Sequence, residues 1–146
     1  MGLLERIRSG TFVSDEGPAL ASPGLRLTLR DAGARIDGGE DLLIVAREFL
    51  DQAGRADALA LAAMIDESPA LTDDRRADAV LAGIAEHLAA LQGVRCPGWT
   101  SAPERFLDRF WFVSTAPGFR AIALAQTPVA LKRRGILWPA RSLRRV

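Results

Sequence analysis

Cysteine and histidine are almost absent from this chain of 146 residues, which contains one of each, Cys96 and His87. A single cysteine cannot form an intramolecular disulfide, as is typical of a protein in a reducing compartment. One cysteine and one histidine also fall short of the four nitrogen or sulfur ligands of a structural zinc site. We therefore expect no disulfide, no metal and no other cofactor.

Long apolar runs are absent as well. No stretch approaches the roughly 18 consecutive apolar residues that read as a membrane helix. Charged residues interrupt the first eight positions, which therefore lack the apolar core of a signal peptide. A hydrophobic content of 49% with 25% charged residues is typical of a globular protein. The composition predicts a cytoplasmic protein of bacterial type that makes no membrane contact.

Acidic residues are missing from the C-terminal part of the chain. From Arg109 to Val146 there are eight Lys or Arg residues and no Asp or Glu, whereas the first 108 residues carry 11 basic and 18 acidic side chains. The total charge of +1 therefore divides into −7 and +8. Such a separation concerns partners and association rather than fold. We expect the basic end to contact something acidic.

Apolar residues recur at helical spacing from about residue 40 onward. This pattern predicts a single compact all-α domain of about five to seven helices over residues 40–146. Ser101 and Glu104 have the spacing of a capping box, which predicts that a helix follows them. The expected helical segments are 42–53, 57–67, 72–92, 105–112, 119–125, 128–134 and a last turn near 139–142.

Glycine and proline punctuate residues 1–39, which we expect to form an irregular N-terminal arm. Within this arm, residues 25–30 alternate apolar and polar side chains. That alternation suits a lone strand, for which residues 11–13 are the only candidate partner, and a short helix fits equally well.

No residue pattern points to catalysis. His87 lies at the edge of an apolar helical stripe with no nucleophile or carboxylate placed to work with it, which favours a packed or capping role. Cys96 precedes a proline and a glycine in a loop and is interpreted as a small half-buried thiol. No glycine-rich loop matches a phosphate-binding pattern. We expect a protein without catalytic residues, not an enzyme.

Two features remain as candidate binding elements. The aromatic residues of segment 99–112 either belong to the core or leave an apolar anchor outside it. The basic C-terminal residues are either solvated helix-terminal cations or contacts to an acidic protein surface or a nucleic acid. The predicted partner-binding residues are Trp99, Phe110, Trp111, Arg133, Arg134, Arg141, Arg144 and Arg145.

The pattern of a tryptophan loop (Trp99-Thr100), an aromatic segment (residues 103–112) and an Arg-Arg-Gly turn (residues 133–135) resembles a bacterial family of helical proteins. That family looks like the antitoxin partners of nucleotidyltransferase-like toxins. The resemblance covers about a third of the chain and implies a non-catalytic antitoxin in a toxin–antitoxin system, with a toxin as the protein partner.

The leading hypothesis is therefore a protein-binding module that neutralises a partner protein. The alternative is a nucleic-acid-binding protein that uses the same basic segment, and its affinity would fall steeply with salt. A homodimer, in which the acidic part of one chain meets the basic part of another, is the third interpretation.

Overall fold

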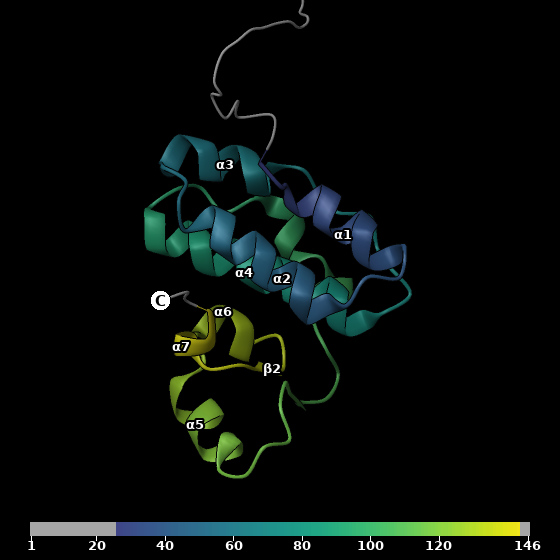
Figure 1. Cartoon of the computed structure of the whole chain (residues 1–146), viewed down its shortest axis with the longest axis vertical. Helices are drawn as coiled ribbons and strands as arrows, with labels where there is room; N and C mark the ends of the chain where they lie inside the picture. The colour runs from purple at the N-terminus through teal and green to yellow at the C-terminus, as the bar shows by residue number, and fades with distance from the viewer. Residues whose placement is uncertain (1–25, 144–146) are drawn as a thin grey trace, which may run out of the picture.

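The structure, a computed structural model, describes residues 26–143, and Figure 1 shows how their elements are arranged. This part of the chain contains seven α-helices and one pair of very short strands. The predicted all-α class is confirmed, and the number of helices lies within the predicted range.

The first four helices form a bundle in the upper half of Figure 1. Their side chains supply most of the hydrophobic core. They are α1 (Leu29–Asp37), α2 (Leu42–Ala53), α3 (Ala58–Asp66) and α4 (Arg75–Gln92).

Aspartates cap three of these helices. The side chains of Asp41, Asp57 and Asp74 accept hydrogen bonds from backbone N–H groups in the first turns of α2, α3 and α4. Aspartate is favoured at this position because it satisfies N–H groups that have no partner within the helix. Part of the acidic excess of the first 108 residues therefore serves helix capping.

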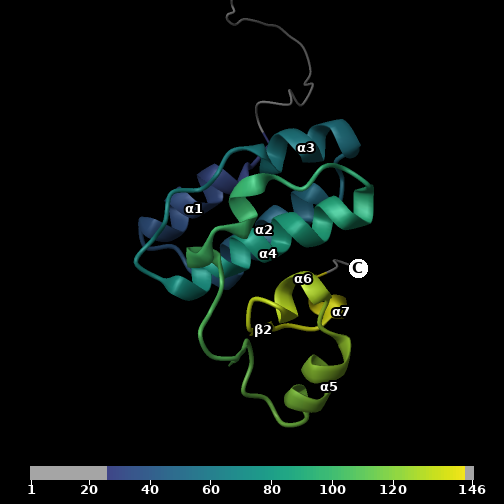
Figure 2. The same cartoon turned by 180° about the vertical axis from the view of Figure 1, so that it is seen from behind.

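Helix α4 is the central element of the molecule. It contacts α1 and α3 on one side and α6 and β2 on the other (Figure 2). Gly83 faces the side chain of Leu131 so closely that even a methyl group there would collide with it. The small side chains of α4 thus allow the C-terminal part of the chain to pack against the bundle.

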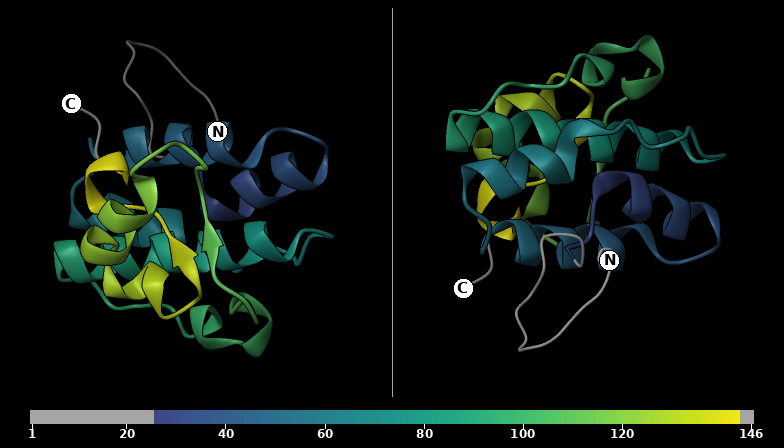
Figure 3. Two further views of the ribbon diagram at one scale, coloured as in Figure 1. Left: turned by 90° about the horizontal axis from the view of Figure 1, so that it is seen from below. Right: turned by 90° about the horizontal axis from the view of Figure 1, so that it is seen from above.

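The C-terminal part alternates short helices with the two strands. A 3-10 turn pair comes first, and the strands β1 and β2 then pair in parallel, with Trp111 opposite Ile136 and Phe112 opposite Leu137 (Figure 3, left). Because parallel strands cannot be joined by a tight turn, α5 and α6 form the connection between them. The elements are η3 (Gly98–Ser101), η4 (Pro103–Arg105), β1 (Trp111–Phe112), α5 (Phe119–Gln126), α6 (Val129–Lys132), β2 (Ile136–Leu137) and α7 (Ala140–Leu143).

The predicted helix over residues 105–112 is wrong. After η4 the chain bends at residues 108–109 and then forms β1, and the backbone N–H groups of Leu107, Trp111 and Val113 donate to carbonyls of residues 134, 135 and 137. A helix would satisfy its own backbone groups and leave those carbonyls without these partners. Pairing with a distant segment therefore overrides the local capping-box signal at Ser101 and Glu104.

The irregular arm expected over residues 1–39 is wrong for its last part. Thr28 caps α1 by accepting a hydrogen bond from the N–H of Asp31, and the helix buries Leu29, Ala32 and Ile36. The helical alternative for residues 25–30 is thus correct from Leu29 onward. The remaining expectations for the arm, including the strand candidate 11–13, lie outside the described residues.

Candidate binding surface

The backbone geometry of residues 107–111 forces one aromatic side chain outward. The N–H of Leu107 donates to the carbonyl of Arg134 (2.9 Å), and the N–H of Trp111 donates to the carbonyl of Gly135 (2.7 Å). Three residues, 108–110, thus separate two amides whose acceptors are adjacent in sequence. The intervening residues must bulge away from the protein, and Phe110 is 71% exposed as a result.

Hollows flank Phe110 on both sides. One has a volume of about 490 Å³ and lies between this bulge and the start of α4, and the other, of about 380 Å³, lies beside the turn that ends α6. We call this region the Phe110 surface. Its residues are Asp74, Arg75, Arg76, Leu107, Asp108, Arg109, Phe110, Trp111, Arg133 and Gly135.

Arginines surround Phe110 and stack on the neighbouring rings. The guanidinium of Arg76 lies 4.7 Å from the ring centre of Trp111, and that of Arg120 lies 4.8 Å from the ring centre of Phe112. Among residues 26–143, neither these two arginines nor Arg109 forms an ion pair with a carboxylate. Their charges remain available to a partner.

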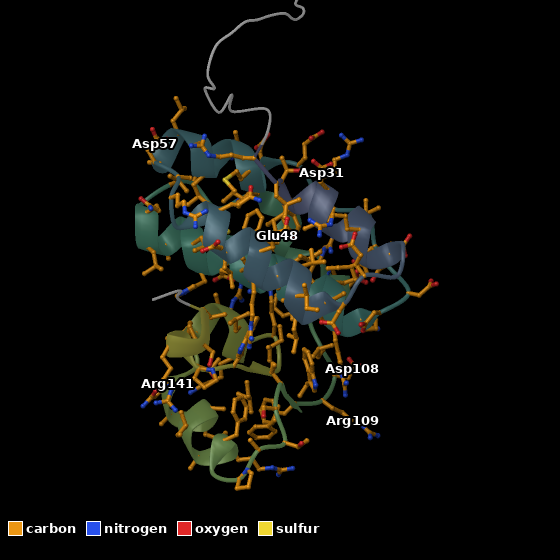
Figure 4. All side chains as sticks on the ribbon, in the orientation of Figure 1. Asp31, Glu48, Asp57, Asp108, Arg109 and Arg141 are labelled. Carbon is orange, nitrogen blue, oxygen red and sulfur yellow. The ribbon has the colours of Figure 1, made fainter. Side chains whose placement is uncertain are left out.

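The predicted binding residues do not form one cluster. Phe110 is exposed and Trp111 half-buried within the Phe110 surface, and Arg133 lies at its edge with 44% of its side chain exposed. Arg141 is exposed on α7, at the opposite edge of the C-terminal part from Arg109 (Figure 4). Arg144 and Arg145 lie outside the described residues.

The predicted partner-binding role of Arg134 is wrong, because its side chain is fully buried and cannot contact a partner. Its guanidinium donates to the carboxylate of Glu86 and to the backbone carbonyls of Ala130 (2.7 Å) and Thr100 (2.7 Å). The same guanidinium lies 4.7 Å from the ring centre of Phe106. Arg134 therefore joins α4, α6 and the η3 turn, and its role is structural.

Arg133 shares the same carboxylate. Its guanidinium lies 3.0 Å from Glu86, which consequently pairs with two arginines. Burial of Glu86 opposes its ionisation, but the hydrogen bonds from Arg134 and Arg133 outweigh burial and lower its pKa. Two of the five predicted arginines are thus partly or wholly neutralised by the protein itself.

Trp99 is also placed differently from its predicted role as an anchor. Its indole Nε1 donates to the carbonyl of Ile65 (3.1 Å), and the guanidinium of Arg105 lies 4.9 Å from its ring centre. Arg105 is itself buried and donates to the carbonyl of Pro69 (2.5 Å). The ring is thus held half-buried against the bundle, outside the Phe110 surface.

Arg75 and Arg76 were missed by sequence reasoning. They follow two aspartates at the start of α4, a pattern that indicates a solvated helix end. Only the fold brings that helix end beside a loop more than thirty residues further along the chain, where Arg75 donates to the carbonyl of Phe106 (3.0 Å). No local signal in the sequence indicates this proximity.

The two residues most capable of chemistry lie elsewhere. His87 is half-buried beside Leu88 in a groove between α2, α4 and α7, and burial lowers its pKa. Cys96 is exposed, not half-buried as expected, with its Sγ 3.3 Å from the hydroxyl of Thr100. Within the described residues, no group of three His, Cys, Asp or Glu side chains could hold a metal ion. Nor does any helix of residues 26–143 have the length and apolar character to cross a membrane.

Searches of family models, curated proteins and solved structures returned no match for this chain. The functional proposal therefore depends on the Phe110 surface itself, where an exposed ring lies beside Arg76 and Arg109, which form no ion pair with a carboxylate of residues 26–143.

Proposed function

We propose that this chain is a non-catalytic binding protein that docks a partner protein on the Phe110 surface. The observation that carries the proposal is the exposure of Phe110 between arginines without carboxylate partners. Exposed aromatic and arginine side chains are the residues that dominate binding energy at protein interfaces. Side chains of a partner can fill the hollows beside Phe110, so the contact need not be flat.

The mixture of charges on this surface favours a protein over a nucleic acid. Asp74 and Asp108 lie among the arginines, and Asp108 forms no ion pair within residues 26–143. A phosphate backbone is uniformly negative and would be repelled by Asp108. A protein surface can place a cation opposite Asp108 and carboxylates opposite Arg76 and Arg109.

The resemblance of residues 99–136 to antitoxins supplies the class of partner. The finer proposal is that the partner is a nucleotidyltransferase-like toxin, whose acidic active site would attract Arg76 and Arg109. Binding there would neutralise the toxin by covering its active site.

Co-purification with the product of the neighbouring gene tests this function. Truncation of a central aromatic anchor costs about 2 kcal/mol or more, so Phe110→Ala should weaken the complex roughly 30-fold. Leu59→Ala is the matched control, because Leu59 is 83% exposed on α3, outside the Phe110 surface. No complex at micromolar concentrations, or equal losses for the two variants, would contradict the proposal.

The stacked pairs of Arg76 with Trp111 and Arg120 with Phe112 favour single-stranded nucleic acid as the second candidate ligand. Asp108→Asn separates the two ligands. It removes a repulsive charge and should tighten oligonucleotide binding, whereas it should weaken or leave unchanged the binding of a protein with mixed charges. Titration of a labelled oligothymidylate at several salt concentrations measures the first effect.

A further inference from the structure

A second recess lies on the bundle, away from the residues that line the Phe110 surface. It has a volume of about 600 Å³ and is formed by α1, the turn at residues 68–71 and the two 3-10 helices. We call it the Trp99 cavity. Its lining residues are Arg30, Gly33, Ala34, Asp37, Ser68, Pro69, Ala70, Leu71, Trp99, Ala102, Glu104 and Arg105.

Small side chains keep this cavity open, and fixed contacts keep its wall in place. Gly33 packs so closely on Pro69 that a Cβ at position 33 would lie 2.8 Å from the Cβ of Pro69. The lining also includes Ala34 of α1, Ala70 and Ala102. Trp99 is held by its hydrogen bond to Ile65 and by the guanidinium of Arg105. The cavity is therefore preformed, which lowers the cost of filling it.

Two acidic and two basic residues line the Trp99 cavity, and they differ in whether they form ion pairs. Asp37 and Glu104 are exposed at the cavity, and neither forms an ion pair among residues 26–143. Arg30 and Arg105 also line the cavity, but Arg30 pairs with Glu67 (3.5 Å), and the buried Arg105 lies 4.0 Å from the carboxylate of Asp78. The unpaired charges are therefore the two carboxylates.

We propose that the Trp99 cavity of one copy of this chain receives Phe110 of a second copy. A cavity of about 150 Å³ is enough to hold benzene, so this one has ample room for a phenyl ring. In this contact Arg109 and Arg76 of the inserted copy face Asp37 and Glu104 of the receiving copy.

Each copy contributes a ring from one surface and a cavity from another. If the two contacts close around a twofold axis, the product is a dimer; if they do not, the product is a longer head-to-tail assembly. Phe110 does not line its own chain's cavity, because Leu107 and Trp111 hold the bulge beside residues 134 and 135. Self-association and the docking of a partner protein then compete for Phe110, although self-association does not require that partner.

Sedimentation of the purified full chain from micromolar to millimolar concentration tests the proposal. The wild type is expected to associate with rising concentration, and more weakly as salt rises above about 0.1 M, where exposed charges are screened beyond about 10 Å. Phe110→Ala removes the ring, and Ala34→Arg fills the cavity and adds a repulsive cation. Each variant alone should associate at least about tenfold more weakly.

Mixing these two variants provides the decisive readout. The Phe110→Ala chain keeps an intact cavity and the Ala34→Arg chain keeps an intact ring, so the mixture should form a one-to-one complex that neither forms alone. Glu104→Arg replaces Ala34→Arg if the latter alters the circular dichroism spectrum, and Leu59→Ala should behave as the wild type. A wild type that stays monomeric throughout, or a mixture without the complex, would overturn the proposal.

Discussion

Arginines at the junction between the bundle and the C-terminal part contrast with those on the Phe110 surface. At the junction, Arg134 is fully buried; its Nη1 and Nη2 groups donate to Glu86 and two backbone carbonyls, while its Nε has no partner among the described residues. On the Phe110 surface, Arg76 and Arg109 are exposed and form no ion pair among the described residues. The same side chain thus stabilises the fold in one place and stays free for binding in the other.

This difference shows what decides the role of a charged residue. A buried guanidinium must be paired because the loss of hydration is expensive, so its partners are fixed by the fold. An exposed one gains little from an intramolecular pair and remains available. Arg133 and Arg134, which are adjacent in sequence, differ in this respect: both pair with Glu86, but the side chain of Arg134 is fully buried whereas 44% of that of Arg133 is exposed.

The largest expected effect on the free energy of unfolding comes from removing the buried contacts of Arg134 at the junction. Arg134→Met leaves Glu86 with one arginine and two backbone carbonyls without their donors, so unfolding should become easier by about 3 kcal/mol. Urea denaturation measures the change. Arg133→Met is the matched control and should cost less than about 1 kcal/mol, because Arg133 is substantially exposed. Equal losses would remove the distinction between the two arginines.

The next largest effect on the free energy of unfolding is expected from tighter packing between α4 and α6 at the same junction. Gly83→Ala places a methyl group against the buried side chain of Leu131, and such overpacking costs about 1 to 3 kcal/mol despite the better helix propensity of alanine. Gly98→Ala is the control, because nothing lies near the added methyl group there. A neutral or stabilised Gly83→Ala protein would show that Leu131 can move without cost.

A smaller effect should appear on acidification. Hydrogen bonds from Arg134 and Arg133 hold the pKa of Glu86 below its ordinary value of 4.5. The interactions of Glu86 with these arginines therefore stabilise the fold at a pH above that value. The contribution is lost as the pH falls through the lowered pKa. The stability difference between the wild type and Glu86→Gln, measured by urea denaturation, should therefore shrink in acid. Hydrogen bonds from Arg35 also lower the pKa values of Glu40 and Glu48, but these groups are common to both proteins. A difference independent of pH would contradict this assignment.

The smallest effect on stability is expected at the Phe110 surface. Phe110→Ala and Arg109→Ala should each change the free energy of unfolding by less than about 0.5 kcal/mol, because neither side chain is buried. Thermal denaturation checks this. A large loss for either variant would mean that the surface supports the fold, and the contrast with the junction would disappear.

Local patterns predicted much of the bundle. The apolar stripe that ends at Gly54, the Asp57 start of α3 and the Gly93 stop of α4 depend on neighbours within one or two helical turns. Because these signals involve only residues that are close in sequence, they can be recognised without knowledge of the tertiary structure. For the candidate site, the same reasoning named Phe110, which the fold leaves exposed, but grouped it with Trp99, whose indole is fixed by Ile65.

The remaining features depend on residues far apart in the chain. The non-helical course of residues 107–113 is set by carbonyls of residues 134–137, and α1 is held by core contacts that its short sequence does not reveal. A capping box and backbone hydrogen bonds to a distant segment contribute free energies of similar size. The local sequence therefore cannot predict which of the two forms.

By itself, the sequence determined an all-α protein whose acidic and basic residues are unevenly distributed and whose helix ends are marked by aspartate and glycine. The tertiary structure alone decided which arginines are free. Arg134 meets Glu86 and Thr100 across 48 and 34 residues of chain, whereas Arg109 meets no carboxylate within the described part. The physical reason is that burial and pairing are properties of the folded neighbourhood, which residues close in sequence need not share.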